Sequence, residues 1–165
     1  IKFIETEIKL IIPKKSLGQN FLNDKNTLNK IINKINITNK NIVEIGPGLG
    51  ALTEKILEKK PKKLIIIEKD FELYKILLKK FDKNKLSIIN DDALTYDFSK
   101  LRNFNLISNL PYNISSKFLL KILKLNMNFT DLVCMIQSEL ADKLDYNKGK
   151  MNKYKFISEH CGRYK

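Results

Sequence analysis

The chain has 165 residues, which fits one compact domain, and 43% of them are hydrophobic, enough for one buried core. It has no apolar run near the roughly 20 residues that span a bilayer and no secretory signal pattern, so we expect a cytoplasmic protein, or an organellar one if a transit peptide preceded Ile1. The net charge of +13 favours a polyanionic partner, although A/T-rich codons impose the same excess of lysine.

Helix and strand patterns alternate along the first half of the chain. Apolar residues recur at helical spacing between Asn26 and Ile37, and Asp24 is a candidate N-cap for this helix. A β-rich run at 41–45 leads into a glycine-rich turn, followed by the helical segment ALTEKILEKK, which Pro61 closes. The next segments predict a buried strand in KLIIIE, an amphipathic helix in DFELYKILLKKF and a third strand in LSIIN.

The alternation continues in the second half of the chain. FNLIS predicts a fourth strand, ISSKFLLKIL a helix, DLVCMIQ a fifth strand and SELADKL a further helix. This order is typical of an α/β fold with a parallel sheet and right-handed crossovers. The strands are apolar throughout, which predicts helices on both faces of the sheet. Cys134 and Cys161 lack a CxxC spacing, so we expect no metal site and no disulfide.

A glycine-rich segment, VEIGPGLGALT, lies where the first strand meets a helix. Gly46, Gly48 and Gly50 allow the backbone to approach a ligand at the free amides of the helix start. Glu68 ends the second strand about 20 residues later, where nucleotide-binding folds place a carboxylate for ribose hydroxyls. These features fit S-adenosylmethionine or a nicotinamide dinucleotide, and a turn that only packs a helix on a sheet is the structural alternative.

Two further carboxylates favour S-adenosylmethionine. Glu44 adds negative charge just before the glycines, which suits a cationic sulfonium and amino group better than a pyrophosphate. Asp92, in the loop NDDAL after the third strand, is placed to accept the adenine amine of a cofactor that crosses the strand ends. By itself, Asp92 fits a solvated loop residue or a helix cap equally well.

The segment NLPY, residues 109–112, follows the fourth strand and carries the predicted chemistry. An exocyclic amine is a poor nucleophile because its lone pair is delocalised into the aromatic ring. Acceptors for both amine hydrogens help to localise that pair, and we predict the Asn109 side chain and the backbone carbonyl of Leu110 or Pro111 in this role. Tyr112 offers a ring on which an extruded base can stack. A turn in which Pro111 merely ends a strand is the structural alternative.

Six segments stand in unbroken order between Lys14 and Tyr154: KKSLGQNFL, VEIGPGLGALT, IIIEKD, NDDAL, NLPYNISS and MIQSELADKL. Together they resemble the ribosomal RNA adenine N6,N6-dimethyltransferase family. The resemblance implies a Rossmann-like class I S-adenosylmethionine-dependent methyltransferase fold, with helices on both faces of a parallel sheet. It also implies dimethylation of adjacent adenines in small-subunit ribosomal RNA, and we expect a monomer that does not bind membranes.

The resemblance assigns roles to residues that match the family motifs. Those for the cofactor are Gln19, Asn20 and Leu22, which would close over it, Gly46 and Gly48 at its methionine part, Glu68 at the ribose, Asp92 at the adenine and Asn109 at its edge. Asn109 would also bind the target amine, and Tyr112 would stack on the target base.

We expect residues 1–165 to form a single methyltransferase domain. Residues 1–23 would be an N-terminal segment carrying the motif QNFL, and residues 145–165 an incomplete C-terminal portion. Members of the family continue into further strands, a target-base loop and a small helical domain, which these residues lack. A catalytically silent RNA-binding or ribosome-assembly factor with the same fold is the main alternative function, and a nicotinamide-dependent dehydrogenase is the second.

Overall fold

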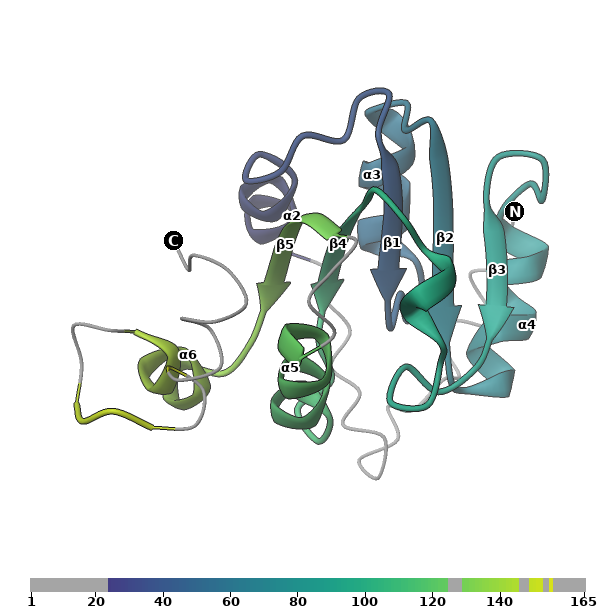
Figure 1. Ribbon diagram of the computed structural model, residues 1–165. Coiled ribbons are helices and arrows are strands. Elements are labelled where there is room, and N and C mark those ends of the chain that lie inside the picture. Colours follow the sequence, from purple (N-terminus) through teal and green to yellow (C-terminus); the bar gives the residue numbers. More distant parts are fainter. Residues whose placement is uncertain (1–23, 125–128, 146–148, 153–154, 156–165) are drawn as a thin grey trace.

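The computed structural model describes residues 24–124, 129–145, 149–152 and 155, and these form a five-stranded parallel sheet with helices on both faces (Figure 1). The strands are β1 (Asn41–Ile45), β2 (Lys63–Glu68), β3 (Ser87–Asn90), β4 (Phe104–Asn109) and β5 (Phe129–Met135), in the spatial order β3-β2-β1-β4-β5. The helices are α2 (Lys25–Ile32), α3 (Ala51–Glu58), α4 (Phe71–Lys80), the 3₁₀ helix η2 (Phe98–Lys100), α5 (Ser115–Lys124) and α6 (Ser138–Leu144). The predicted α/β fold is confirmed.

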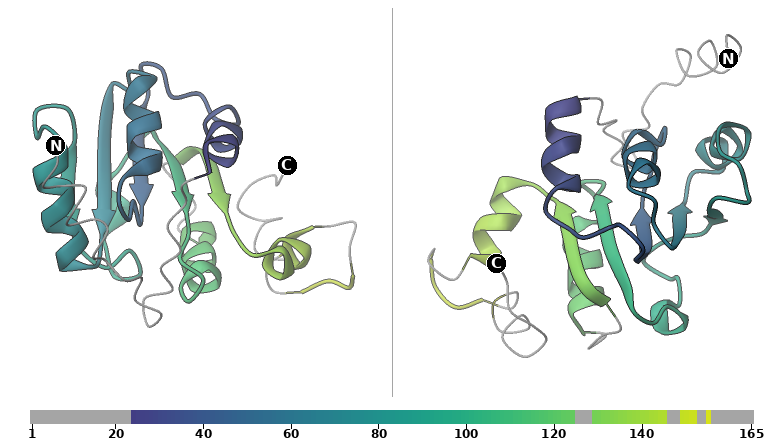
Figure 2. Two further views of the ribbon diagram at one scale, coloured as in Figure 1. Left: turned by 180° about the vertical axis from the view of Figure 1, so that it is seen from behind. Right: turned by 90° about the horizontal axis from the view of Figure 1, so that it is seen from above.

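Alternate residues of each central strand enter two separate cores. On one face Ile42 and Ile66 pack against apolar residues of α2, α3 and α4, and on the other Val43 and Ile65 pack against α5, α6 and Phe98. Figure 2 shows α2, α3 and α4 on one side of the sheet and α5 on the other. Strands β1, β2 and β4 are buried almost throughout, whereas the edge strands β3 and β5 are partly exposed. The predicted cover on both faces is therefore complete only for the three central strands.

The first helix shows how local sequence sets an element's ends. Asp24 caps it as predicted, because its carboxylate accepts hydrogen bonds from the amides of Asn26 and Thr27. The helix ends at Ile32, earlier than the apolar pattern predicts. Ile35 and Ile37 are buried, but they belong to the loop that leads into β1 and pack there against the core of α2 and α3.

The strand order fixes where a ligand can bind. The chain leaves β1 towards β2 on one side and returns to β4 on the other, so the connections diverge at the carboxyl ends of β1 and β4. In open α/β sheets this divergence leaves a crevice for a ligand. Within the described part of the chain, none of the helices has the length and apolar character needed to cross a membrane.

Candidate active site

The predicted site residues within the described ranges gather at the carboxyl edge of the sheet, where the strand arrowheads lie in Figure 1. In chain order they are Glu44, Gly46 and Gly48 at β1, Glu68 at β2, Asp92 after β3, and Asn109, Leu110, Pro111 and Tyr112 at β4. Backbone hydrogen bonds join the loops: the Gly46 amide donates to the Ile67 carbonyl at 3.0 Å, and the Asp91 amide to the Glu68 carbonyl at 3.2 Å. The structure thus brings these residues together.

The glycine turn lies directly against the NLPY turn. Gly46 has a φ of +63°, and a Cβ added there would lie 3.3 Å from Cδ of Pro111. A side chain at this position would therefore strain the backbone and press against the Pro111 ring. Gly50, at the start of α3, packs against a different neighbour, since a Cβ there would approach the Phe81 ring to 2.6 Å. Its role is to let α3 and α4 pack closely.

Glu68 connects the end of β2 to the glycine turn. One carboxylate oxygen accepts the Gly48 amide at 3.2 Å and the other accepts the Asp70 amide at 2.8 Å. Burial raises the pKa of Glu68 above its ordinary value, and the two amide donors lower it in part. Each oxygen still has a lone pair for a further donor, because a carboxylate offers about four acceptor positions. The carboxylate is therefore suited to a pair of ribose hydroxyls.

Glu44 is more deeply enclosed than its place beside the glycines indicates. It is 1% exposed and faces α3, where its carboxyl oxygen lies 2.7 Å from the Thr53 hydroxyl. Burial raises the pKa of Glu44 to about 8, with the Thr53 hydrogen bond lowering it and the charge of Glu68 raising it. Most of the Glu44 side chains are therefore protonated at pH 7. The negative charge predicted for a sulfonium is present only when this carboxyl ionises.

Asp92 is held by its own loop and by a cation. Its Oδ1 accepts the Leu94 amide at 2.8 Å, and its Oδ2 lies 2.8 Å from Nζ of Lys69. Burial raises the pKa of Asp92, but the hydrogen bonds from Lys69 and Leu94 outweigh it and leave the pKa below its ordinary value. Asp92 is thus an ionised acceptor at the edge where an adenine is predicted to lie. Neither Lys69 nor Thr53 is predicted from the sequence, because Lys69 pairs with a residue 23 positions away and Thr53 lies on a helix of ordinary pattern.

The four residues of the NLPY turn differ in exposure and in hydrogen bonding. Asn109 ends β4, Leu110 is buried, and Tyr112 is 59% exposed. The Pro111 carbonyl already accepts three hydrogen bonds, from the Ile114 amide at 3.2 Å, the Ser115 amide at 3.1 Å and the Ser115 hydroxyl at 2.8 Å. The Leu110 carbonyl receives the same hydroxyl at a longer 3.5 Å. Of the two predicted backbone acceptors, the Leu110 carbonyl therefore has the greater capacity for a new donor.

The remaining predicted site residues are Gln19, Asn20 and Leu22, which lie outside the described residues. Their role in closing over a cofactor stays a prediction. Among the described residues, no group of three histidine, cysteine, aspartate or glutamate side chains is arranged to hold a metal ion.

The curated proteins to which this chain is similar include ribosomal RNA small subunit methyltransferases. It is 46% identical over 152 residues to the ribosomal RNA small subunit methyltransferase A of Pelagibacter ubique, an alignment that covers 88% of this chain and 58% of that protein. The chain spans about half the length of the curated relatives it matches.

Solved structures agree in fold. A dimethyladenosine transferase from Plasmodium falciparum is 32% identical with a TM-score of 0.64, over 76% of this chain and 46% of that one. The 23S rRNA methyltransferase ErmE has a TM-score of 0.71 at 24% identity, over 85% of this chain and 57% of that one, and supports the fold alone. The model of the ribosomal RNA adenine dimethylase family matches residues 13–157. This chain therefore belongs to the ribosomal RNA adenine dimethylase family.

Proposed function

We propose that this chain transfers methyl groups from S-adenosylmethionine to the N6 amine of adenine in small-subunit ribosomal RNA. The product would be N6,N6-dimethyladenosine at adjacent adenines, made during ribosome biogenesis by a cytoplasmic monomer. The observation that carries the proposal is the contact between the glycine turn and the NLPY turn at Gly46 and Pro111. This contact sets a candidate methyl-donor site beside a candidate amine site. The names of the relatives from Pelagibacter ubique and Plasmodium falciparum support the same substrate.

The residues at the carboxyl edge fit S-adenosylmethionine. Gly46 and Gly48 adopt positive φ in the turn at the end of β1, and this glycine turn would bind the methionine part. The Glu68 carboxylate would bind the ribose hydroxyls and the Asp92 carboxylate the adenine amine. When bound, the cofactor supplies a methyl group on a cationic sulfonium. Gln19, Asn20 and Leu22 would close over it, as predicted from the resemblance.

The NLPY turn would prepare the target amine for attack. We assign one N6 hydrogen to the Asn109 side-chain oxygen and the other to the Leu110 carbonyl, because the Pro111 carbonyl already holds three donors. Two acceptors favour the geometry in which the nitrogen lone pair points out of the plane of the ring. They also stabilise the positive charge that develops on the nitrogen. The proton then leaves to water, so no strong general base is needed.

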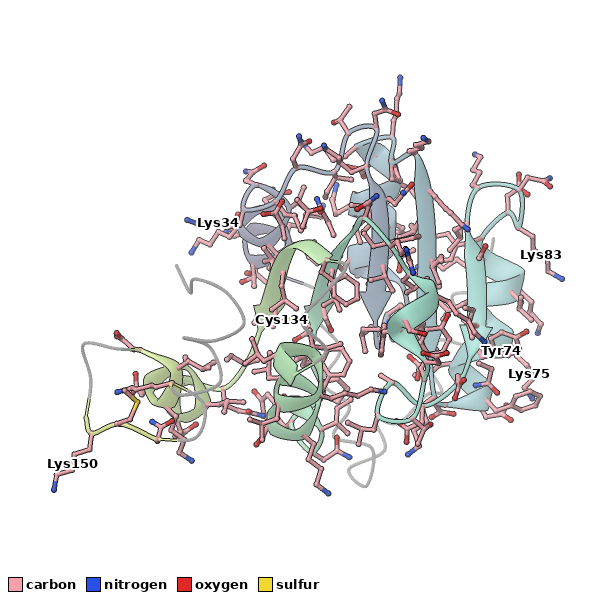
Figure 3. All side chains as sticks on the ribbon, viewed as in Figure 1. Lys34, Tyr74, Lys75, Lys83, Cys134 and Lys150 are labelled. Atoms are coloured by element: carbon pink, nitrogen blue, oxygen red, sulfur yellow. The ribbon has the colours of Figure 1, made fainter. Side chains whose placement is uncertain are left out.

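Exposed lysines on the surface favour binding of a polyanionic partner. Exposed lysines that include Lys34, Lys83 and Lys150 project into solvent (Figure 3). Cations in such positions attract phosphates and release counterions on contact. A/T-rich codon use accounts for the same lysines, so this observation supports the RNA substrate without carrying it.

Replacing Glu68 with alanine is expected to weaken S-adenosylmethionine binding roughly tenfold or more. The reason is that a hydrogen bond to a charged group contributes about 1.5–3 kcal/mol. Titration calorimetry measures the change, and Glu72→Ala, an exposed glutamate on α4, is the matched control. Unchanged affinity in Glu68→Ala would remove Glu68 from the cofactor site.

Replacing Tyr112 with alanine is expected to weaken productive RNA engagement while leaving cofactor affinity intact. Tyr112 is 59% exposed, and stacking of its ring on a base contributes about 1–3 kcal/mol. Tyr112→Phe keeps the ring face, so it should retain much of the activity. The dependence of the single-turnover rate on RNA concentration separates the two variants. Equal loss in both would assign the effect to the hydroxyl and refute the stacking role.

The transfer of labelled methyl groups to undermethylated small-subunit particles tests the proposed function. We expect label in the RNA of these particles and little in large-subunit particles. RNA binding without any transfer, by a protein that binds the cofactor, would instead identify a catalytically silent assembly factor.

A further inference from the structure

The ammonium group of Lys121 donates its hydrogen bonds to the backbone of a single loop. From α5, its Nζ lies 2.7 Å from the Tyr96 carbonyl, 2.9 Å from the Leu94 carbonyl and 3.2 Å from the Ala93 carbonyl. It also lies 5.0 Å from the centre of the Phe98 ring. An ammonium group has three N–H donors, so these three carbonyls account for its full capacity. Lysine side chains on a surface are usually solvated, which makes this arrangement specific.

The loop that Lys121 holds is the one that carries Asp92. The Asp92 carboxylate accepts the Leu94 amide at 2.8 Å, and its backbone carbonyl accepts the amides of Thr95 at 2.9 Å and Tyr96 at 2.8 Å. Leu94 and Tyr96 therefore bind Asp92 through their amides and Lys121 through their carbonyls. Movement of Leu94 would alter the direction of the Asp92 carboxylate, and movement of Tyr96 would alter the position of the Asp92 backbone.

The same helix is attached to the NLPY turn at its other end. Ser115 begins α5, and its hydroxyl donates to the Pro111 carbonyl at 2.8 Å. Lys121 lies less than two turns further along the helix, since an α-helix has 3.6 residues per turn. One rigid element thus contacts the candidate amine site at its start and the Asp92 loop at Lys121.

We propose that Lys121 is a positioning residue that fixes Asp92 for adenine recognition and ties the cofactor's adenine loop to the NLPY turn through α5. This inference rests on the proposed function, because it takes Asp92 as the acceptor of the cofactor's adenine amine. The positive charge of Lys121 also holds this loop, since Asp91, Asp92 and Asp97 all interact electrostatically with the ammonium group. The hydrogen-bond geometry adds direction to that attraction.

The test compares two product analogues that differ at the base. S-adenosylhomocysteine carries the 6-amino group that Asp92 would accept, whereas S-inosylhomocysteine carries a 6-oxo group that cannot donate. We expect the wild-type protein to prefer the adenosyl compound roughly tenfold or more, the range for losing a hydrogen bond to a charged group. Lys121→Met should reduce that preference several-fold towards the level of Asp92→Ala, with little change in affinity for the inosyl compound. A merely structural loss would lower both affinities by the same factor.

Three controls make the outcome decisive. Lys117→Met, an exposed lysine one turn earlier on α5, should keep the wild-type preference. In the double variant Asp92→Ala/Lys121→Met, the second change should add nothing to the first, because Lys121 acts through Asp92. If Lys121→Met does not fold, Lys121→Arg retains the charge but not a compact three-donor head, and it should also lose preference.

The outcomes separate this inference from the proposed function. A wild-type protein that binds neither analogue would contradict the proposed function itself. A wild-type protein that prefers the adenosyl compound, with that preference lost in Asp92→Ala but fully kept in Lys121→Met and Lys121→Arg, would overturn the role of Lys121 alone.

Discussion

Replacing Asn109 with alanine is expected to lower the single-turnover rate of methyl transfer about 10²–10³-fold, the loss typical when one preorganised polar contact to a transition state is removed. Asn109 ends β4, and the glycine turn of β1 lies against the NLPY turn that Asn109 begins. Its side-chain oxygen is proposed to hold one hydrogen of the attacking amine. Because that contact strengthens as charge develops on the nitrogen, its loss should appear mainly in the rate.

Single-turnover transfer at saturating cofactor and RNA measures this effect. Asn105→Ala is the matched control, since Asn105 is a buried asparagine of the same strand whose amide donates to the Asn36 carbonyl, away from the carboxyl edge. That control should reduce stability but not the rate of the folded protein. A wild-type rate in Asn109→Ala would show that the amine is not activated by this side chain.

Replacing Glu44 with glutamine is expected to stabilise the protein increasingly as the pH rises from about 5 to 8. The pKa of Glu44 is about 8 in the folded protein, against an ordinary value of 4.5. A carboxyl whose folded pKa is raised contributes its full stability below the unfolded pKa and loses it as pH rises through the folded pKa. Glutamine does not titrate and keeps an acceptor for Thr53. Its advantage should reach the order of 3–5 kcal/mol at pH 8, since each pH unit contributes about 1.4 kcal/mol.

Urea unfolding at pH 5, 6.5 and 8 checks this prediction. The free energies of unfolding of the variant and the wild type should be close at pH 5 and diverge towards pH 8. Glu58→Gln changes an exposed glutamate of α3 and should stay within about 0.5 kcal/mol of wild type at each pH. A constant difference between Glu44→Gln and wild type across this range would mean that Glu44 ionises normally in the folded protein.

Much of the fold could be predicted from the sequence, because short consecutive segments determine where most strands and helices lie. Strands β1 and β2 match their predicted residues because continuous apolar runs stop at a glycine turn and at a charged pair. The gathering of the candidate site residues at the carboxyl edge was predictable for the same reason, since their motifs are short consecutive segments at strand ends. The end of α2 was not, because Ile35 and Ile37 are apolar residues of a buried loop rather than of a helix.

The electrostatics of the site depend on contacts between distant segments. In a strand buried on both faces, polarity does not alternate, so the sequence does not reveal that Glu44 faces Thr53 inside the protein. The ion pair of Lys69 with Asp92 and the three bonds of Lys121 join residues 23 to 28 positions apart. In the sequence, Lys69 and Lys121 resemble ordinary surface lysines, and only the folded structure shows their partners.

Nucleoside analysis of small-subunit RNA measures the proposed reaction most directly. Undermethylated particles are incubated with the protein and labelled S-adenosylmethionine, and the digested RNA is examined by mass spectrometry. We predict labelled N6,N6-dimethyladenosine with the wild-type protein and its loss with Asn109→Ala. RNA without any labelled adenosine, from a wild-type protein that binds both the cofactor and the particles, would contradict the proposed methyl transfer.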